Sequence, residues 1–139
     1  MKIALVAQHA TPLSSDGASQ LGDDVRLRQL SRQLARAGHR VTVYTGRRET
    51  AAAEKSRLAA GVRVECIGTG GGLSEPDLLA GVPAFSGPLR ERWGRERPDV
   101  VHALRWTSGL AALAAARDLR IPVVQSFDSL GVEIGRAHV

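Results

Sequence analysis

A stretch rich in serine, glycine and proline, residues 9–21, separates a short apolar run from an amphipathic segment that begins at Gly22. Loops of this length in a folded domain are usually functional or disordered. A loop that leads into a helix can present free backbone N–H groups and the positive end of the helix dipole, and both bind phosphate. The sequence therefore predicts an anion-binding site where this helix begins.

Other residues that could contact a ligand or carry a proton follow the remaining apolar runs. His102 ends one run, although a single histidine at the end of a strand is more often a hydrogen-bonded structural residue. His9 lies on the long loop and is freer to contact a ligand. Trp106 either lines a pocket or covers the edge of a sheet. Asp128 is either a general base in a cleft or a solvated loop carboxylate.

Other kinds of chemistry find less support. The four histidines and the single cysteine, Cys66, lack the spacing of a metal site, and no Ser-His-Asp order can be argued. The run GTGGG at residues 68–72 opens no helix and is interpreted as a turn. The net charge of +5 comes from 17 arginines and two lysines, but no basic run exceeds two residues and aromatic residues make up only 4%. We therefore expect no nucleic-acid binding, and the positive field suits an anionic ligand such as a nucleotide diphosphate.

The elements that would position these residues alternate in type. Short apolar runs predict strands at 2–7, 40–45, 62–67, 99–103 and 121–127, and amphipathic stretches predict helices at 22–37, 77–94 and 107–119. Residues 49–60 fit a short helix or a loop. This alternation predicts a Rossmann-like α/β domain with a parallel sheet and helices on both faces. Ligands of open α/β sheets bind beyond the carboxyl ends of the strands, where the sequence places His9, His102, Trp106, Ser108 and Asp128.

Local signals indicate where the helices begin and end. Gly38 is expected to end the first helix. Thr107 or Ser108 is expected to cap the third. The second is expected to break into pieces at its glycines and prolines, namely Gly81, Pro83, Gly87 and Pro88.

The length of 139 residues suits about one domain. No apolar run approaches the roughly 18 residues that span a bilayer. The opening KIALVAQ is short and contains a glutamine, so it indicates a buried strand rather than a signal peptide. A single cysteine excludes an internal disulfide and fits a reducing compartment. We therefore expect a cytoplasmic chain with no transmembrane segment, while peripheral contact with a membrane stays open.

Four stretches occur together in this chain: KIALVAQHATPL, LSRQLARAGHRVTVYTGRR, RPDVVHALRWTSGLAALAAARDLRIPVVQSF and the DSLG that follows. Together they resemble the N-terminal, acceptor-side domain of family-4 retaining glycosyltransferases. DLLAGVPAF at residues 77–85 resembles the segment before the fourth strand of that family. The similarity is greatest to the sucrose-phosphate-synthase-like and glycosyl-inositol-type branch, and it covers residues 1–132.

The resemblance implies a GT-B architecture, in which two Rossmann-like domains face a cleft, and this chain would be the N-terminal half, incomplete. It implies transfer of a hexosyl group, with retention, from a nucleotide-sugar co-substrate to a small-molecule or glycan acceptor, without a metal or other cofactor. The residues implied in the loop that approaches the donor diphosphate are Leu21, Gly22 and Asp23. The residues implied on the acceptor side are His9, His102, Trp106 and Ser108.

Two positions depart from the family pattern. The loop commonly ends in a Gly-Gly-Gln-Asn-like stretch, and here Asp23 and Asp24 place two carboxylates where a diphosphate would approach. The family usually has a histidine after the phenylalanine of the fifth strand, where this chain has Asp128. Since an aspartate cannot donate as a neutral imidazole can, two interpretations stay open. One is an enzyme with altered chemistry at Asp128, and the other is a non-catalytic Rossmann-like module that binds nucleotide or sugar.

The last residues, 133–139, read EIGRAHV, which the codons GAG-ATC-GGA-AGA-GCA-CAC-GTC encode. These codons contain AGATCGGAAGAGCACACGTC, the start of a widely used sequencing-library adapter. We therefore expect residues 133–139 to be adapter-derived and residues 1–132 to be a truncated domain whose donor-binding partner domain is missing, so that this chain alone is inactive. Codons in the gene that differ from the adapter string would contradict this expectation.

Overall fold

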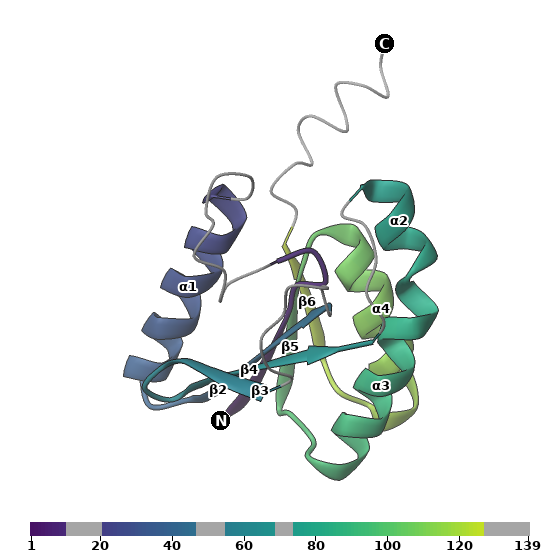
Figure 1. Ribbon diagram of the computed structural model, residues 1–139. Coiled ribbons are helices and arrows are strands. Elements are labelled where there is room, and N and C mark those ends of the chain that lie inside the picture. Colours follow the sequence, from purple (N-terminus) through teal and green to yellow (C-terminus); the bar gives the residue numbers. More distant parts are fainter. Residues whose placement is uncertain (11–20, 47–54, 69–73, 127–139) are drawn as a thin grey trace.

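The computed structural model describes residues 1–10, 21–46, 55–68 and 74–126, which form a sheet with helices on both faces (Figure 1). The six strands lie in the order β3-β4-β2-β1-β5-β6. They are β1 (Lys2–Val6), β2 (Arg40–Gly46), β3 (Lys55–Ala59), β4 (Val62–Ile67), β5 (Val100–Leu104) and β6 (Val123–Ser126). The helices are α1 (Leu21–Arg36), α2 (Glu75–Ala80), α3 (Val82–Arg95) and α4 (Trp106–Ala116), followed by the 3-10 helix η1 (Arg117–Leu119).

The pairing of the strands confirms the predicted Rossmann-like architecture. β1 pairs in parallel with β2 and with β5. The pairs β2–β4 and β5–β6 are also parallel. The first helix ends as expected, because Gly38 has a φ of 97°, a conformation that glycine adopts without strain. None of the helices in the described part of the chain is long and apolar enough to cross a membrane.

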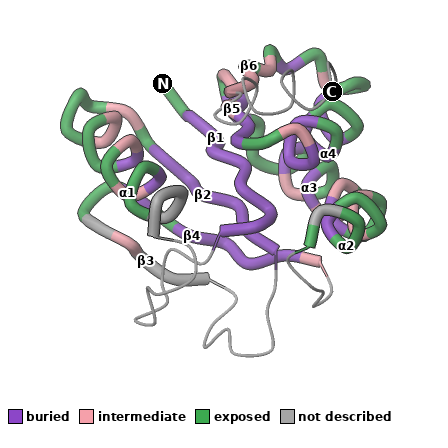
Figure 2. Tube along the Cα trace, turned by 90° about the horizontal axis from the view of Figure 1, so that it is seen from above, coloured by how far each residue is buried: buried purple, intermediate pink, exposed green. Residues whose placement is uncertain are grey.

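The two faces of the sheet have different coverings. α1 lies on one face and α2, α3 and α4 lie on the other, with the buried strands between them (Figure 2). The core under α1 is aliphatic, and the fully buried Leu27 joins Leu5 and Val43 there. The core on the other face contains Trp93 and Phe85 of α3 together with alanines of α4. Because alanine is small, α4 can lie close to both the sheet and α3.

Residues 55–59 differ from the sequence prediction, which gave 49–60 as a short helix or loop. The structure places β3 there, antiparallel to β4, with a register shift between Arg57 and Ala59. The turn at Gly61, which has a φ of 80°, reverses the chain between the two strands. Pairing with β4 therefore overrides the helical composition of this alanine-rich segment.

The second predicted helix does break at Gly81, where α2 ends and α3 begins. The expected breaks at Gly87 and Pro88 are wrong, because α3 continues through both residues. Pro88 cannot donate to the carbonyl of Ala84, four residues earlier. A Cβ on Gly68 would lie only 3.1 Å from that carbonyl oxygen. The chain after β4 therefore approaches α3 at the helical turn where Pro88 removes a backbone hydrogen bond.

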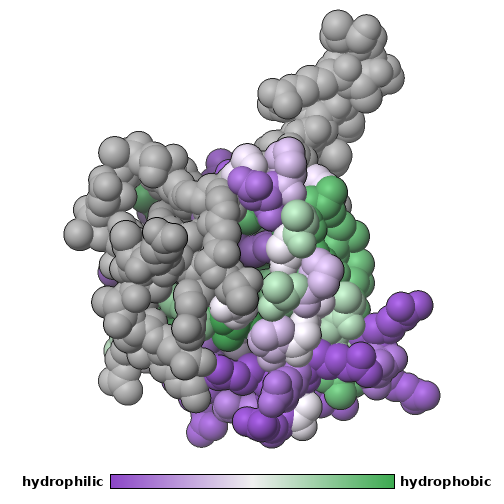
Figure 3. All heavy atoms as spheres, turned by 45° about the vertical axis from the view of Figure 1, so that its right-hand side comes forward, coloured by the Kyte–Doolittle hydropathy of each residue, from purple (hydrophilic) through white to green (hydrophobic). Residues whose placement is uncertain are grey.

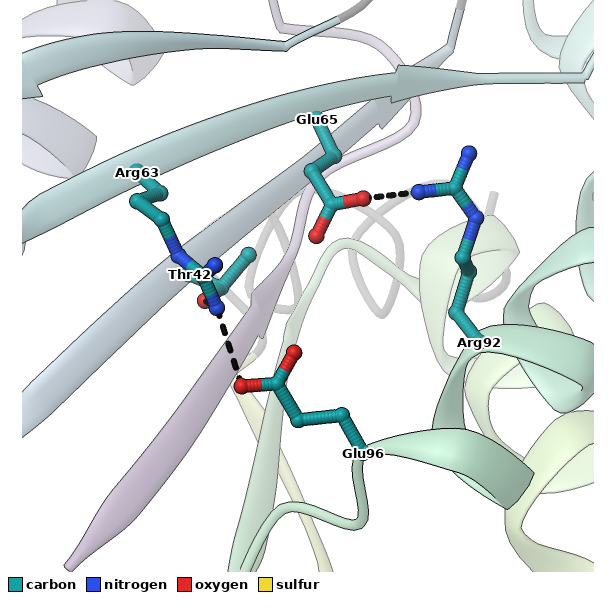
Figure 4. A network of polar contacts seen from close by, with 5 residues as sticks. All are labelled: Thr42, Arg63, Glu65, Arg92 and Glu96. Carbon is teal, nitrogen blue, oxygen red and sulfur yellow. Dashed lines mark hydrogen bonds and ion pairs between the residues drawn. The ribbon is translucent and has the colours of Figure 1, made fainter.

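A polar network links the sheet to the carboxyl end of α3 (Figure 4). Glu65 of β4 is buried and forms an ion pair with Arg92 of α3. Arg63, two residues earlier, pairs with Glu96 at 3.1 Å on the surface. Tyr44 packs edge-on against Trp93, with ring centroids 5.9 Å apart. Burial first, and then the nearby Glu65 carboxylate, raise the pKa of Tyr44 to about 12.

Candidate functional site

The carboxyl ends of the parallel strands come together around Gln8, the second residue after β1. The backbone N–H of Gln8 donates to the Ser108 hydroxyl of α4 at 2.9 Å. Its side-chain amide donates to the carbonyl of Leu78 in α2 at 3.1 Å, and its own carbonyl accepts from Gly46 N–H at 3.1 Å. One residue thus joins β1 to β2 and to two helices on the same face.

Ser108 is completely buried, and its hydroxyl is an acceptor for β1 rather than a cap for α4. The expectation that Thr107 or Ser108 caps this helix is therefore wrong. α4 begins one residue earlier, at Trp106, and its N-cap position is Arg105, which makes no side-chain cap hydrogen bond. Arg105 has a φ of 69°, so the chain leaves β5 in a left-handed conformation immediately before the helix begins.

His102 and His9 lie in different environments. His102 is half-buried in β5, and its Nε2 contacts the Ser126 hydroxyl of β6. This contact orients the imidazole at the strand end. His9 follows Gln8 and is only 3% exposed, so it is less open to a ligand than the loop position suggested. Trp106 is half-buried at the start of α4. Acceptor contact by these residues stays a prediction.

Gln125 of β6 contacts the turn between β5 and α4. Its side-chain Nε2 lies 2.8 Å from the Arg105 carbonyl oxygen and 3.2 Å from that of Ala103. The same Arg105 carbonyl accepts from Gly109 N–H at 3.1 Å, within the first turn of α4. β6 therefore holds the end of β5 at two adjacent positions, through Gln125 and through Ser126.

A hollow of about 260 Å³ lies between α1 and the ends of β5 and β6. Its lining residues are Arg26, Gln29, Leu30, Gln33, Leu104 and Ser126. The hollow is small for a drug-sized ligand and suits a group the size of one sugar ring. A second hollow of about 310 Å³ lies at the opposite end of the sheet, and its charged lining includes the Arg63–Glu96 pair. Ligands of such sheets bind at the carboxyl ends, so we assign the site to the first hollow.

Several predicted site residues lie at or beyond the limits of the described structure. Leu21, Gly22 and Asp23 form the first turn of α1, as the phosphate prediction requires of the backbone. Asp128, the loop at 11–20 and the glycine-rich run at 69–73 lie outside the described residues. The roles of Asp128 and of the three loop residues therefore stay predictions.

Gln8 and Gln125 were not among the site residues predicted from the sequence. Each is an amide near the end of an otherwise apolar run, KIALVAQ or IPVVQSF. Buried amides must be hydrogen-bonded, so an amide at such a strand end indicates a neighbour with unpaired backbone groups. The amides at the two strand ends therefore indicated buried hydrogen bonds, but the sequence does not show which residues accept or donate them.

Apart from Arg26, the described polar residues of the site are neutral hydrogen-bonding groups rather than a nucleophile and base in contact. Amide, hydroxyl and imidazole groups can bind the hydroxyls of a polar ligand and orient them. The described part of the chain contains no group of three side chains that could hold a metal ion. The arrangement is thus suited to binding and orienting a polyhydroxylated ligand, and a reacting partner would have to approach from outside these residues.

Comparisons with known proteins give a consistent result. A family model described as a glycosyl transferase 4-like domain matches residues 22–138. A D-inositol 3-phosphate glycosyltransferase of Streptomyces griseus is 28% identical over 93% of this chain, and one of Catenulispora acidiphila is 33% identical over 94%. Sucrose-phosphate synthase from Thermosynechococcus elongatus has a similar structure, with a TM-score of 0.80 and 22% identity over 94% of this chain.

The matched proteins are much longer than this chain. It spans 29% of the Streptomyces protein, 32% of the Catenulispora protein and 34% of the sucrose-phosphate synthase chain. These matches are consistent with a fragment that carries one domain of a larger protein.

Proposed function

We propose, because this chain belongs to the glycosyl transferase 4-like family, that it forms the acceptor-binding half of a GT-B glycosyltransferase. The donor-binding half would lie in a second domain outside this sequence. The observation that carries the proposal is the hollow between α1 and the carboxyl ends of β5 and β6, where the lining residue Ser126 contacts His102. Its polar lining, Arg26, Gln29, Gln33 and Ser126, lies where a second domain would close over a ligand.

The reaction would be transfer of a hexosyl group from a nucleotide-sugar with retention of configuration, without a bound metal or cofactor. The first turn of α1, at Leu21, Gly22 and Asp23, would face the donor diphosphate, because a helix N-terminus stabilises anions. Asp128 would lie near the reacting sugar. The protein would act in the cytoplasm, where nucleotide-sugars are made.

The acceptor would be a small phosphorylated polyol or sugar. This assignment rests on the relatives, which are named for inositol 3-phosphate and for sucrose phosphate. The net charge of +5 supports it, since a positive field raises the local concentration of anionic ligands.

Incubation of the full-length gene product with a panel of nucleotide-sugars tests the proposal. We expect donor hydrolysis with one of them, and faster donor consumption when an inositol phosphate or a hexose phosphate is added. NMR of the product would show the same anomeric configuration as the donor. An inverted product would contradict retention alone, whereas no donor turnover with any pair would contradict the proposed function.

A non-catalytic binding module is the alternative, favoured by Asp128 at a position where the family usually has histidine. It predicts saturable binding of a nucleotide-sugar to the full-length protein, measured by calorimetry, with no turnover. Replacement of Asp128 by histidine separates the two: turnover gained only in the Asp128→His variant identifies a degenerate transferase.

A further inference from the structure

We infer that Gln125 is a positioning residue, which holds the turn between β5 and α4 in the form that contacts the acceptor, and that Gly109 is the residue that makes room for it. The inference rests on the proposed function and assigns a role to a side chain that does not itself need to touch the substrate. It concerns three residues from two segments: Arg105, Gly109 and Gln125.

The first element is a strained backbone. Arg105 has a φ of 69° and a ψ of 154°, a region that residues other than glycine rarely adopt. Such a conformation is strained and persists only where the surrounding structure fixes it. Strain of this kind is concentrated at functional sites, and here it lies directly after the carboxyl end of β5.

The second element is the hydrogen bonding that fixes the strained residue. The carbonyl oxygen of Arg105 accepts from Gly109 N–H at 3.1 Å and from Gln125 Nε2 at 2.8 Å. The first bond belongs to the helix, and the second comes from the neighbouring strand. Gln125 therefore ties the start of α4 to the sheet at the strained peptide.

The third element is the close approach of Gln125 to α4. A Cβ placed on Gly109 would lie 1.7 Å from Gln125 Oε1 and 2.8 Å from its Cδ. No side chain fits there while Gln125 keeps its position. Glycine is less favourable than alanine inside a helix, and the space that Gln125 occupies accounts for glycine at this position.

The consequence for the site follows from the position of the turn. Arg105 is exposed and Trp106 is half-buried, and both follow β5, in which the His102 ring contacts Ser126 of the same strand as Gln125. If Gln125 is removed, the Arg105 peptide can relax to an unstrained conformation, and the turn that carries Arg105 and Trp106 moves relative to Leu104 and Ser126, which line the hollow. Acceptor binding then weakens, while the donor, held mainly by the second domain, is bound as before.

Steady-state kinetics of the full-length transferase test this inference. We expect Gln125→Ala and Gln125→Met each to raise the acceptor KM about five- to tenfold, the effect of losing one oriented hydrogen bond, and to change acceptor-free donor hydrolysis less than twofold. Gln125→Met keeps the length and bulk of the side chain, so it is informative if the alanine variant folds poorly. Val124→Ala, on the exposed neighbour in β6, is the matched control and should leave the KM unchanged.

A double-variant cycle separates positioning from packing. Gly109→Ala alone should push the flexible Gln125 amide away from the Arg105 carbonyl, so it should raise the acceptor KM as the Gln125 variants do without lowering the thermal midpoint. The double variant Gly109→Ala, Gln125→Ala should show no further rise in acceptor KM, because both changes remove the same contact. An acceptor KM within twofold of wild type in both Gln125 variants, or restored in the double variant, would overturn the inference. A wild-type protein without donor turnover would instead overturn the proposed function on which it rests.

Discussion

The two ends of the sheet are held together by different chemistry. At the amino ends of the strands, the described contacts of side chains and of the N-terminus each include at least one charged group. The N-terminal ammonium contacts His39 Nδ1 at 3.1 Å, Lys2 N–H donates to the Asp99 carboxylate at 2.7 Å, and Arg63 pairs with Glu96. Figure 3 shows hydrophilic residues gathered at the lower end of the molecule, where α3 ends.

At the carboxyl ends, the described contacts are between neutral groups. Gln8 N–H donates to Ser108, Gln125 donates to the Arg105 carbonyl, and His102 contacts Ser126. Such bonds are directional and fix backbone position without adding a permanent charge. Under the proposed function, these neutral groups add no repulsion towards anionic ligands at that end. Ion pairs can hold the opposite end.

The largest effect is expected from the buried ion pair between Glu65 of β4 and Arg92 of α3. Arg92→Met removes the charge and leaves the Glu65 carboxylate buried, so the free energy of unfolding should fall by roughly 3 kcal/mol. Urea denaturation measures it. The matched control on the same helix is Arg95→Met, whose exposed pair with Glu91 should be worth at most about 0.5 kcal/mol. Equal effects of the two variants would contradict the distinction between buried and surface pairs.

The next effect concerns pH. The folded-state pKa of Tyr44, about 12, lies above its unfolded value near 10. The neutral, buried tyrosine therefore contributes its full share to the free energy of unfolding below pH 10, and this contribution is lost as the pH rises toward 12. Between pH 10 and pH 12 the free energy of unfolding of the wild-type protein should fall by about 2–3 kcal/mol more than that of the Tyr44→Phe variant. Unfolding midpoints in urea across this range measure the difference between the two proteins. Parallel pH profiles would mean that Tyr44 ionises freely in the folded state.

The smallest effect on stability is expected at the carboxyl end. Ser108→Ala leaves the buried Gln8 N–H without its acceptor and should cost about 1–2 kcal/mol. The same variant should raise the acceptor KM, because Gln8 and His9 follow β1 into the site, whereas Arg92→Met should leave it unchanged. Ser86→Ala, which removes an exposed hydroxyl bonded to Pro83, is the control for both measurements. A larger KM effect from Arg92→Met than from Ser108→Ala would break the comparison between the two ends.

The sequence was sufficient to predict the parallel strands and the two long helices, because their apolar residues repeat at strand and helix periods. It failed at β3, where pairing with β4 outweighs a helical composition, and at Pro88, where the freed carbonyl of Ala84 lies next to Gly68. For the site, the periodicity placed His102 and Ser108 at the right end of the sheet. It could not show that Ser108 accepts a bond from Gln8, a residue 100 positions away, because such pairs are set only by the fold.

β3 has a consequence for how the molecule behaves in solution. Among the strands of the described residues it lies at the edge of the sheet, and a regular edge offers unpaired backbone groups to strands of other molecules. The register shift between Arg57 and Ala59 interrupts that regularity, and the strand sequence, KSRLA, contains two cations within five residues. Both features oppose the addition of a further strand, so this edge resists intermolecular β-sheet growth and the aggregation that follows from it.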